Sequence, residues 1–418
     1  MKRLGALVSC LLTAVLLLSA CGTGSGARDQ ALTIWATNVN VPILQKAAEL
    51  YAKDHPGFKL NVVEMANDDI RSKVTIGLQA KGQGLPDAAL LVDDGIHGYL
   101  EKFPDVFVNL SAKGFDEYRS QFPGYKVDSV SLNGDMYAFP FDAGPVGVFY
   151  RTDLFEQAGV DASRIHTWAD YIEAGKKIRQ ATGASMLSYD STDSTVFTIL
   201  LSQQGLGYFD EQGNATLGTP QAQNVASLFS ELKKNGLLIG SPGWNAWVTS
   251  LSSSQSATAI TGAWLIGTLQ QQLPDQSGKW GVMPLPAFEE GGSQSANQGG
   301  SSFVISRTSP RADEAYEFLK YFTTSFEMQE LAMEGGLFPS YLPTYESKLF
   351  SEPVEYFAGK PVWTFFADEM SKIPSVLYTA NDIFARNEAI KVQAEVTNGM
   401  DPAASLQGAA TRIENRVQ

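Results

Sequence analysis

Residues 32–94 read LTIWATNVNVPILQKAAELYAKDHPGFKLNVVEMANDDIRSKVTIGLQAKGQGLPDAALLVDD, and this stretch decides the fold class. Three short runs rich in apolar residues have the length of β-strands: residues 32–36, 58–62 and 88–92. Helical patterns at residues 43–53 and about 68–81 separate them, and they end at the helix-stopping residues Pro56-Gly57 and Gly82. Alternation of strand and helix in this order predicts a parallel sheet with helices on both faces.

A second α/β region is expected from about Asp142 to Gln298. Just before it, Asn133-Gly134 lies between alternating residues and predicts a tight hairpin turn. Further strands are expected at residues 136–141, 146–150 and 302–305, and further helices near residues 167–182, 220–235 and 311–321. The chain therefore reads as an α/β protein built from two regions.

Length and composition indicate the number of domains and exclude several classes of function. The 418 residues suggest two or three domains, and 44% hydrophobic residues are enough for large cores. A net charge of −14 argues against a nucleic-acid partner, which would require a basic surface. Cys10 and Cys21 are the two cysteines, so no disulfide framework or cysteine zinc site is expected after them. The three histidines lack metal-ligand spacing, and we expect no metal or cofactor.

The N-terminus has the pattern of an export signal. Lys2 and Arg3 precede an uncharged apolar run at residues 4–18, and Leu18-Ser19-Ala20-Cys21-Gly22 resembles a bacterial lipobox. This predicts a signal peptide at residues 1–20, a lipidated Cys21 and a flexible tether at residues 21–30. The alternative is an ordinary signal peptide that is cut near Ala20 and leaves Cys21 free.

Eight segments follow one another in the order of a known family: residues 32–35, 133–140, 147–155, 167–168, 257–264, 280–286, 299–300 and 336–340. Among them, Gly134-Asp135-Met136-Tyr137-Ala138-Phe139-Pro140 is similar to the family's G-x-x-Y-A-x-P segment, and Ala257 to Trp264 is similar to A-A-M-x-x-G-x-W. From residue 32 onward the chain resembles the extracellular solute-binding proteins of bacterial ABC importers, in the sugar-binding class typified by maltose-binding protein. Arg151-Thr152 replaces the commoner Asn-Lys and changes only the surface.

The resemblance implies a two-lobe periplasmic-binding-protein fold (type II-like) whose discontinuous lobes are joined by a multi-crossing hinge. We expect the first lobe to comprise residues 31–139 and 301–345, and the second residues 140–300 and 346–418. Crossings are expected at residues 139–142, 284–299 and near 342–352. It also implies a non-enzymatic, monomeric protein that closes on a solute, docks on membrane permease subunits and contacts the membrane through its lipid anchor alone.

A sugar ligand would need flat aromatic surfaces for its ring faces and paired polar groups for its hydroxyls. Four tryptophans are candidates for stacking, with core packing as the alternative for each: Trp244, Trp247, Trp264 and Trp363. Nine residues are candidates for polar contacts: Asn38, Glu64, Asp93, Asp94, Asp142, Tyr189, Asp190, Asn297 and Gln298. For Asp93 and Asp94 the alternative is a helix N-cap, and for Asp142 it is a role in the hinge. The number of aromatic candidates favours an oligosaccharide.

Two other functions remain open. An exported glycoside hydrolase needs only a pair of carboxylates, but no nucleophile elbow, zinc-protease motif or phosphate loop is present. The same fold could instead bind a polyol, glycerol phosphate or an iron complex. A phosphate group would call for converging arginines or lysines, and we expect none at the strand ends.

Overall fold

The computed structural model describes residues 31–417. The expected signal peptide, the lipidated Cys21 and the tether before residue 31 lie outside the described residues. Within residues 31–417, no helix combines the length and apolar character that are needed to cross a membrane.

The first sheet has the strand order β2-β1-β3-β12-β6. Its strands are β1 (Leu32–Ala36), β2 (Leu60–Glu64), β3 (Ala88–Val92), β6 (Ala138–Pro140) and β12 (Ser301–Ile305). Strands β1, β2 and β3 are parallel, as the sequence predicts, whereas β12 is antiparallel to β3 and β6. β2 begins two residues later than expected, because Gly57 turns the chain at a φ of 96° and the Phe58 ring packs against Tyr51 and Phe318.

Six helices surround this sheet: α1 (Asn40–Asp54), α2 (Asn67–Gln79), α3 (Asp93–Lys102), α4 (Gly124–Ser129), α11 (Ala312–Thr324) and α12 (Phe326–Glu334). The predicted hairpin is confirmed, since β4 (Ser131–Leu132) pairs with β5 (Asp135–Met136). Asn133 and Gly134 have φ values of 53° and 91°, the left-handed conformations that a type I′ turn requires at both central positions.

The second sheet has the strand order β11-β7-β10-β8-β9. Its strands are β7 (Val146–Arg151), β8 (Ser185–Asp190), β9 (Leu238–Ser241), β10 (Ser256–Gly262) and β11 (Trp280–Met283). Strands β8, β9 and β10 are parallel, and β7 runs antiparallel to its neighbours β10 and β11. The carboxyl ends of the three parallel strands therefore lie at one edge of the sheet, where α/β proteins place ligand sites.

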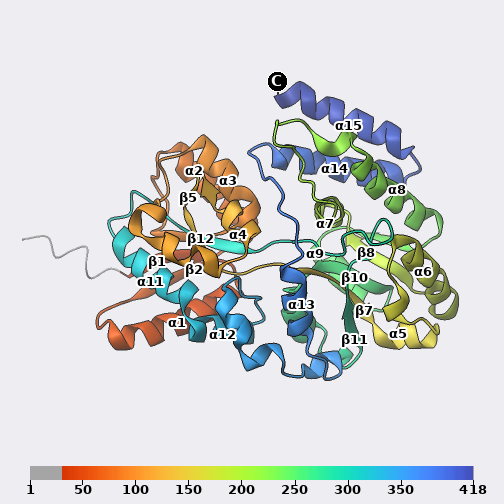
Figure 1. Cartoon of the computed structure of the whole chain (residues 1–418), viewed down its shortest axis with the longest axis horizontal. Coiled ribbons are helices and arrows are strands. Elements are labelled where there is room, and N and C mark those ends of the chain that lie inside the picture. Colours follow the sequence, from red (N-terminus) through yellow and green to blue (C-terminus); the bar gives the residue numbers. More distant parts are fainter. Residues whose placement is uncertain (1–30, 418) are drawn as a thin grey trace, which may run out of the picture.

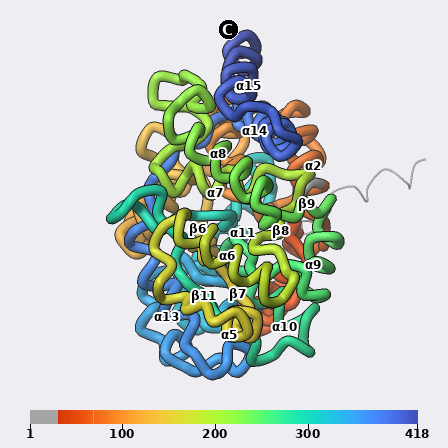
Figure 2. Tube along the Cα trace, turned by 90° about the vertical axis from the view of Figure 1, so that its right-hand side faces the viewer, coloured from red at the N-terminus to blue at the C-terminus, as the bar shows by residue number. Residues whose placement is uncertain are grey.

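The helices of this half come from two separate parts of the chain. The first part supplies α5 (Thr152–Gln157), α6 (Trp168–Thr182), α7 (Thr195–Ser202), α8 (Pro220–Lys234), α9 (Trp244–Ser252) and α10 (Leu265–Gln272). The second part supplies α13 (Val362–Met370), α14 (Asp382–Thr397) and α15 (Pro402–Val417). Figure 2 shows α14 and α15 beside α8 at one end of the molecule, and α5, α10 and α13 at the other.

Each sheet has its own hydrophobic core, which makes two lobes (Figure 1). The core around the first sheet is drawn from residues 32–141 and 303–341, and the core around the second from residues 146–296 and 385–413. A third cluster lies beneath α9, α10 and α13 on the side of the second sheet. The two-lobe α/β fold expected from the sequence is thereby confirmed.

Three segments connect the lobes. Residues 141–143 pair with residues 338–340, so the third crossing begins before the expected position near residue 342. The return crossing comprises residues 297–301 and is shorter than the expected residues 284–299, because Leu285 and Ala296 already belong to the second core. Residues 371–381 run from α13 to α14, which both belong to the second lobe, and this segment lies between the lobes without crossing from one to the other (Figure 1).

Candidate ligand cleft

A cavity of about 400 Å³ lies between the lobes, and we call it the charged cavity. The first lobe contributes Arg71, Val92 and Asp94, from α2, the end of β3 and the start of α3. From the second lobe, the loop after β8 and the start of α7 contribute Thr192, Asp193, Ser194, Thr195 and Thr198, and α14 contributes Ile383, Arg386, Asn387 and Ile390. The return crossing contributes Asn297, Gln298 and Gly299, and the segment before α14 contributes Tyr378. Both lobes thus form its walls.

A second cavity of about 230 Å³, the tryptophan cavity, adjoins the first and shares Asp193, Thr195 and Gln298 with it. Three tryptophans line it together with polar and aliphatic residues: Trp244, Trp247, Trp264, Asp190, Val196, Ile260 and Thr261. Because the two cavities share lining residues, they form one elongated site, which we call the cleft.

The three tryptophans differ in how much surface they offer to a ligand. Trp244 is 41% exposed, and its ring centroid lies 5.8 Å from that of Trp264 and 5.3 Å from that of Trp247. Trp247 is buried, its indole nitrogen donates to the backbone oxygen of Ser188 at 3.0 Å, and its ring packs against that of Trp244. Trp244 and Trp264 therefore offer the aromatic surface of the cleft.

Gln298 connects the two ends of the cleft. Its Oε1 accepts hydrogen bonds from the indole nitrogen of Trp264 at 2.8 Å and from the hydroxyl of Thr261 at 3.3 Å. Neighbouring Asn297 accepts from the amide of Gly144 at 3.2 Å and from the hydroxyl of Tyr125 at 3.3 Å. The return crossing thus presents amide groups to the cleft, as the sequence predicts.

Asp190 and Asp193 shape the loop between β8 and α7. Oδ1 of Asp190 accepts from the amide of Thr192 at 2.8 Å and from the amide of Gly243 at 2.9 Å, which ties this loop to the turn before Trp244. Asp193 accepts from the amide of Thr195 at 2.8 Å, and burial raises the pKa of its carboxyl. Both carboxylates line the cleft and keep oxygens that can accept further hydrogen bonds.

Asp94 pairs with two arginines at the charged end of the cleft. Its carboxylate accepts from Arg71 at 3.1 Å within the first lobe and from Arg386 at 2.5 Å across the cleft. The expectation that no cations cluster at the strand ends is therefore wrong. Arg386 lies 292 positions further along the chain, on α14, and only the tertiary fold brings it to this strand end.

Asp93 and Asp142 belong to a buried cluster at the hinge rather than to the cleft lining. Asp93 is 3% exposed, and its carboxylate accepts from Nζ of the fully buried Lys126 at 2.5 Å and from the Ser302 hydroxyl at 2.7 Å. Lys126 also donates to the backbone oxygens of Asp142 at 2.5 Å and Ser301 at 2.9 Å. One ammonium group thereby holds two crossings to the first lobe.

The Asp142 carboxylate is held by its neighbour across the hinge. It accepts from the amide of Ser301 at 2.6 Å, and burial raises its pKa to about 6 although Lys126 opposes the rise. The backbone here is close-packed, because a side chain on Gly300 would lie 3.0 Å from the Asp142 carbonyl oxygen. The hinge role, which was the alternative for Asp142, fits this position.

Four other predicted residues line neither cavity. Tyr189 is buried and packs its ring edge against Phe229, with centroids 5.2 Å apart. Trp363 lies in the core beneath α13, 6.1 Å from the ring of Phe338. Asn38, which follows β1, and Glu64, which ends β2, are both exposed. Their ligand roles stay predictions without support from these cavities.

Several residues that line the charged cavity are not among the sequence candidates, and they include Arg71, Asp193, Thr195, Tyr378 and Arg386. Asp193 and Thr195 had a signal, because they closely follow the candidate Asp190 at the carboxyl end of β8, where such sheets place ligand sites. Arg71 lies within a helical pattern, and Tyr378 and Arg386 lie far along the chain, so no local pattern marks them.

These features define a two-lobe α/β binding protein with one elongated site between its lobes. The family model described as bacterial extracellular solute-binding protein matches residues 46–358. The chain belongs to this family, which confirms the resemblance expected from its motifs.

Individual relatives agree with this assignment. A lactose-binding protein of Rhizobium radiobacter is 36% identical over 380 residues, covering 89% of this chain and 88% of the relative. An arabinooligosaccharide-binding protein of Bacillus subtilis is 27% identical over 362 residues, 83% of each chain. Among solved structures, an ABC transporter associated binding protein from B. animalis subsp. lactis, in complex with beta-1,6-galactobiose, has a TM-score of 0.78 at 25% identity and covers 92% of this chain and 97% of that one.

Proposed function

We propose that this protein is the substrate-binding component of an ABC importer and that it captures a carbohydrate in the cleft. The observation that carries this proposal is the pairing of accessible aromatic ring faces with polar groups in one site. Trp244 and Trp264 provide apolar faces, and Asp190, Asp193 and Gln298 lie beside them. Sugars need both kinds of contact, because their rings are apolar on the faces and their hydroxyls must be paired when buried.

The cargo we propose is an oligosaccharide of two or more units. The cleft is elongated, with aromatic rings at one end and the Asp94 ion-pair cluster at the other. The relatives named for lactose and arabinooligosaccharide, and the structure with galactobiose, support a cargo of this class. A single sugar ring would leave one end of such a cleft unfilled.

A thermal-shift panel tests the cargo class. The full mature chain is heated with lactose, arabino-oligosaccharides, monosaccharides, polyols and sugar phosphates, since a ligand that binds only the folded state raises the melting temperature. We expect stabilisation by neutral oligosaccharides above all. Stabilisation by phosphorylated compounds alone would replace the sugar assignment by an anionic cargo.

An anionic cargo is the second candidate, because Arg71 and Arg386 both reach the charged cavity. A relative from Brucella melitensis is named an sn-glycerol-3-phosphate-binding protein and is 23% identical over 360 residues. However, Asp94 accepts hydrogen bonds from both arginines and offsets part of their charge. A neutral sugar fits this partly compensated site better than a dianion does.

The hydrolase alternative has a direct test. We propose that the protein binds without turnover, since its family relatives are solute-binding proteins. The mature chain is incubated with oligosaccharides, and new reducing ends are measured over a day. An increase above that of a Trp264→Ala variant would overturn the binding-only proposal.

We also propose that Cys21 is lipidated, anchors the protein outside the cytoplasm, and leaves a monomer free to dock on permease subunits. The lipobox-like residues 18–22 support the anchor. The Cys21→Ser variant, expressed in a bacterial host with the wild type as control, should move from the membrane fraction to the soluble extracytoplasmic fraction. Equal membrane retention of both proteins would contradict the anchor. Light scattering of the mature chain tests the monomer.

A further inference from the structure

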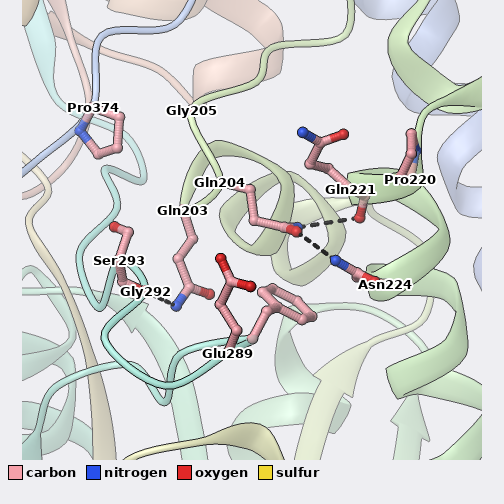
Figure 3. Close-up of a pocket in the computed structure, with 11 residues that line it drawn as sticks. Gln203, Gln204, Gly205, Pro220, Gln221, Asn224, Glu289, Gly292, Ser293 and Pro374 are labelled. Carbon is pink, nitrogen blue, oxygen red and sulfur yellow. Dashed lines mark hydrogen bonds between the residues drawn. The ribbon is translucent and has the colours of Figure 1, made fainter.

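The largest of the cavities described here does not belong to the cleft. This outer pocket has a volume of about 650 Å³ and lies wholly on the second lobe and its connection to α14 (Figure 3). The end of α7, the start of α8, the loop at residues 288–293 and Pro374 form its walls. Its size falls within the roughly 300–1,000 Å³ that is typical of small-molecule sites.

The outer pocket is separated from the cleft by residues 371–381. Pro374 of this segment lines the outer pocket, whereas Tyr378 lines the charged cavity. The segment is firmly seated, because a side chain on Gly207 would lie 2.4 Å from the backbone oxygen of Leu377. The two sites share no lining residue, so the pocket is not an extension of the cleft as it stands.

Gln203 provides an unpaired acceptor at this pocket. The side chain is 1% exposed, and its Nε2 donates to the backbone oxygens of Pro286 at 2.8 Å and Ser293 at 2.6 Å. These two bonds fix the orientation of the amide, since a flip would place its oxygen against two carbonyls. Its Oε1 is buried and has no hydrogen-bond partner. An unpaired buried acceptor is unfavourable by about 1–3 kcal/mol, so this oxygen favours a molecule that can donate a hydrogen bond.

Glu289 adds acceptor capacity on the same side. Figure 3 shows the side chains of Gln203 and Glu289 turned toward one another. Within the described part of the chain, Glu289 forms no ion pair, and no lysine, arginine or histidine lines the pocket. Its walls therefore disfavour an anion. A metal ion is also disfavoured, because residues 31–417 contain no group of three or more metal-ligating side chains.

The remaining walls combine amides with apolar surface. Gln204 is held by Asn224, whose Nδ2 donates to it at 3.0 Å, and its own Nε2 donates to the backbone oxygen of Gln221 at 3.2 Å. Phe288 and two prolines supply the apolar area. Fixed amides, one carboxylate and an aromatic ring suit a ligand with many hydroxyl donors and an apolar ring face.

We propose that the outer pocket is a second binding site, for a neutral polyhydroxylated molecule, on the second lobe outside the cleft. Two sources can supply this chemistry. One is a second molecule of the sugar that fills the cleft, and the other is a different hydroxyl-rich molecule, such as a polyol, that the cleft does not hold. The site does not depend on the proposed cargo.

Residue-resolved NMR of the full mature chain, labelled with nitrogen-15, tests the proposal. Lactose and mannitol are titrated separately, and the amide signals of Gly205, Asn224 and Gly292 report on the outer pocket. We expect saturable shifts of these signals with at least one of the two compounds. The Trp264→Ala variant should keep these shifts while the signals of the cleft respond less, which separates the two sites.

Saturation with lactose alone assigns the site to cargo-like sugar, whereas saturation with mannitol assigns it to hydroxyl-rich molecules in general. The Glu289→Ala variant removes one charged acceptor and should weaken binding at the pocket about tenfold. Glu290→Ala is the matched control, because Glu290 is an exposed neighbour that does not line the pocket. The absence of saturable shifts with both compounds, equal affinities of the two variants, or a response to inorganic phosphate alone would each overturn the proposal.

Discussion

Single residues of the cleft divide into those that offer surface to a ligand and those that hold the others in place. Trp264 does both, since its ring lines the cleft while its indole nitrogen donates to Gln298 at 2.8 Å. The indole nitrogen of Trp247 donates to Ser188, and its ring supports that of Trp244. The same residue type therefore has different roles at positions 17 residues apart, and burial decides which.

Replacing Trp264 by Ala should weaken sugar binding by about 1–3 kcal/mol, because a stacked aromatic face is lost. Calorimetric titration measures the effect, and circular dichroism checks that the fold is retained. Phe326→Ala is the control, since Phe326 is an aromatic residue on α12 that is 40% exposed and lines neither cavity of the cleft. Equal affinity of both variants would remove Trp264 from the site.

Asp142 should make stability depend on pH. Its folded pKa of about 6 lies above the ordinary aspartate pKa of 3.8, so the folded state binds more protons than the unfolded state between these values. The contribution of this group to the free energy of unfolding therefore falls as the pH rises from about 4 to about 6, by about 1–3 kcal/mol, and is constant above that window.

Asp142→Asn keeps an oxygen that can accept from the Ser301 amide but removes the titration. Urea unfolding of both proteins between pH 4 and 7 measures the difference, which should grow in favour of the variant as the pH rises. Wild-type and variant curves that stay parallel over this range would contradict the prediction.

At the scale of elements, α4 fastens two crossings to the first lobe through one side chain. Lys126 is its only lysine and is fully buried, with a carboxylate and two backbone oxygens as partners. Without tight pairing, a buried ammonium would be strongly unfavourable. Because residues 142 and 301 are held to the first lobe, bending of the hinge is expected between them and the second sheet, near Gly144 and Gly299.

Lys126→Met should destabilise the fold by about 3–5 kcal/mol, because it leaves the buried Asp93 carboxylate without its charged partner. Lys113→Met is the control, since Lys113 pairs on the surface with a 92% exposed Asp313 and should cost less than about 1 kcal/mol. Urea unfolding at neutral pH compares the two. Similar losses would mean that the buried pair contributes no more than a surface pair.

On the scale of the whole molecule, closure depends on contacts made across the cleft. Arg386 of the second lobe reaches Asp94 of the first at 2.5 Å. Residues 371–381 also lie against α3, since a side chain on Gly98 would come within 2.8 Å of the Ala380 Cα. A sugar that contacts both lobes would favour the closed state by its extra affinity for that state.

Arg386→Ala should shift the sugar-free protein toward a more open arrangement, because it removes a charged contact between lobes. Small-angle X-ray scattering should show a larger radius of gyration than for the wild type. Lys391→Ala is the control, because Lys391 lies on the same helix but pairs with Glu388 of that helix. An unchanged radius for Arg386→Ala would show that this ion pair does not hold the lobes together.

Three features follow directly from the amino-acid sequence: the parallel strands at residues 32–36 and 88–92, the Asn133-Gly134 turn and the family. Each of these features depends on residues that are close together in the sequence. They are apolar runs of strand length, residues that tolerate positive φ, and short motifs in a fixed order. The sequence also marked Trp264 and Gln298 as ligand candidates, and both residues line the cleft.

Which of the strand-end carboxylates line the cleft depends on the packing of distant parts of the chain. Asp93 and Asp94 are adjacent in sequence, yet one turns inward to Lys126 and the other outward to two arginines. Arg386 and Tyr378 enter the cleft from a segment that lies about 300 residues away from β3. Such pairings depend on how elements that are distant in the sequence pack together, and the spacing of residues along the chain does not predict this packing.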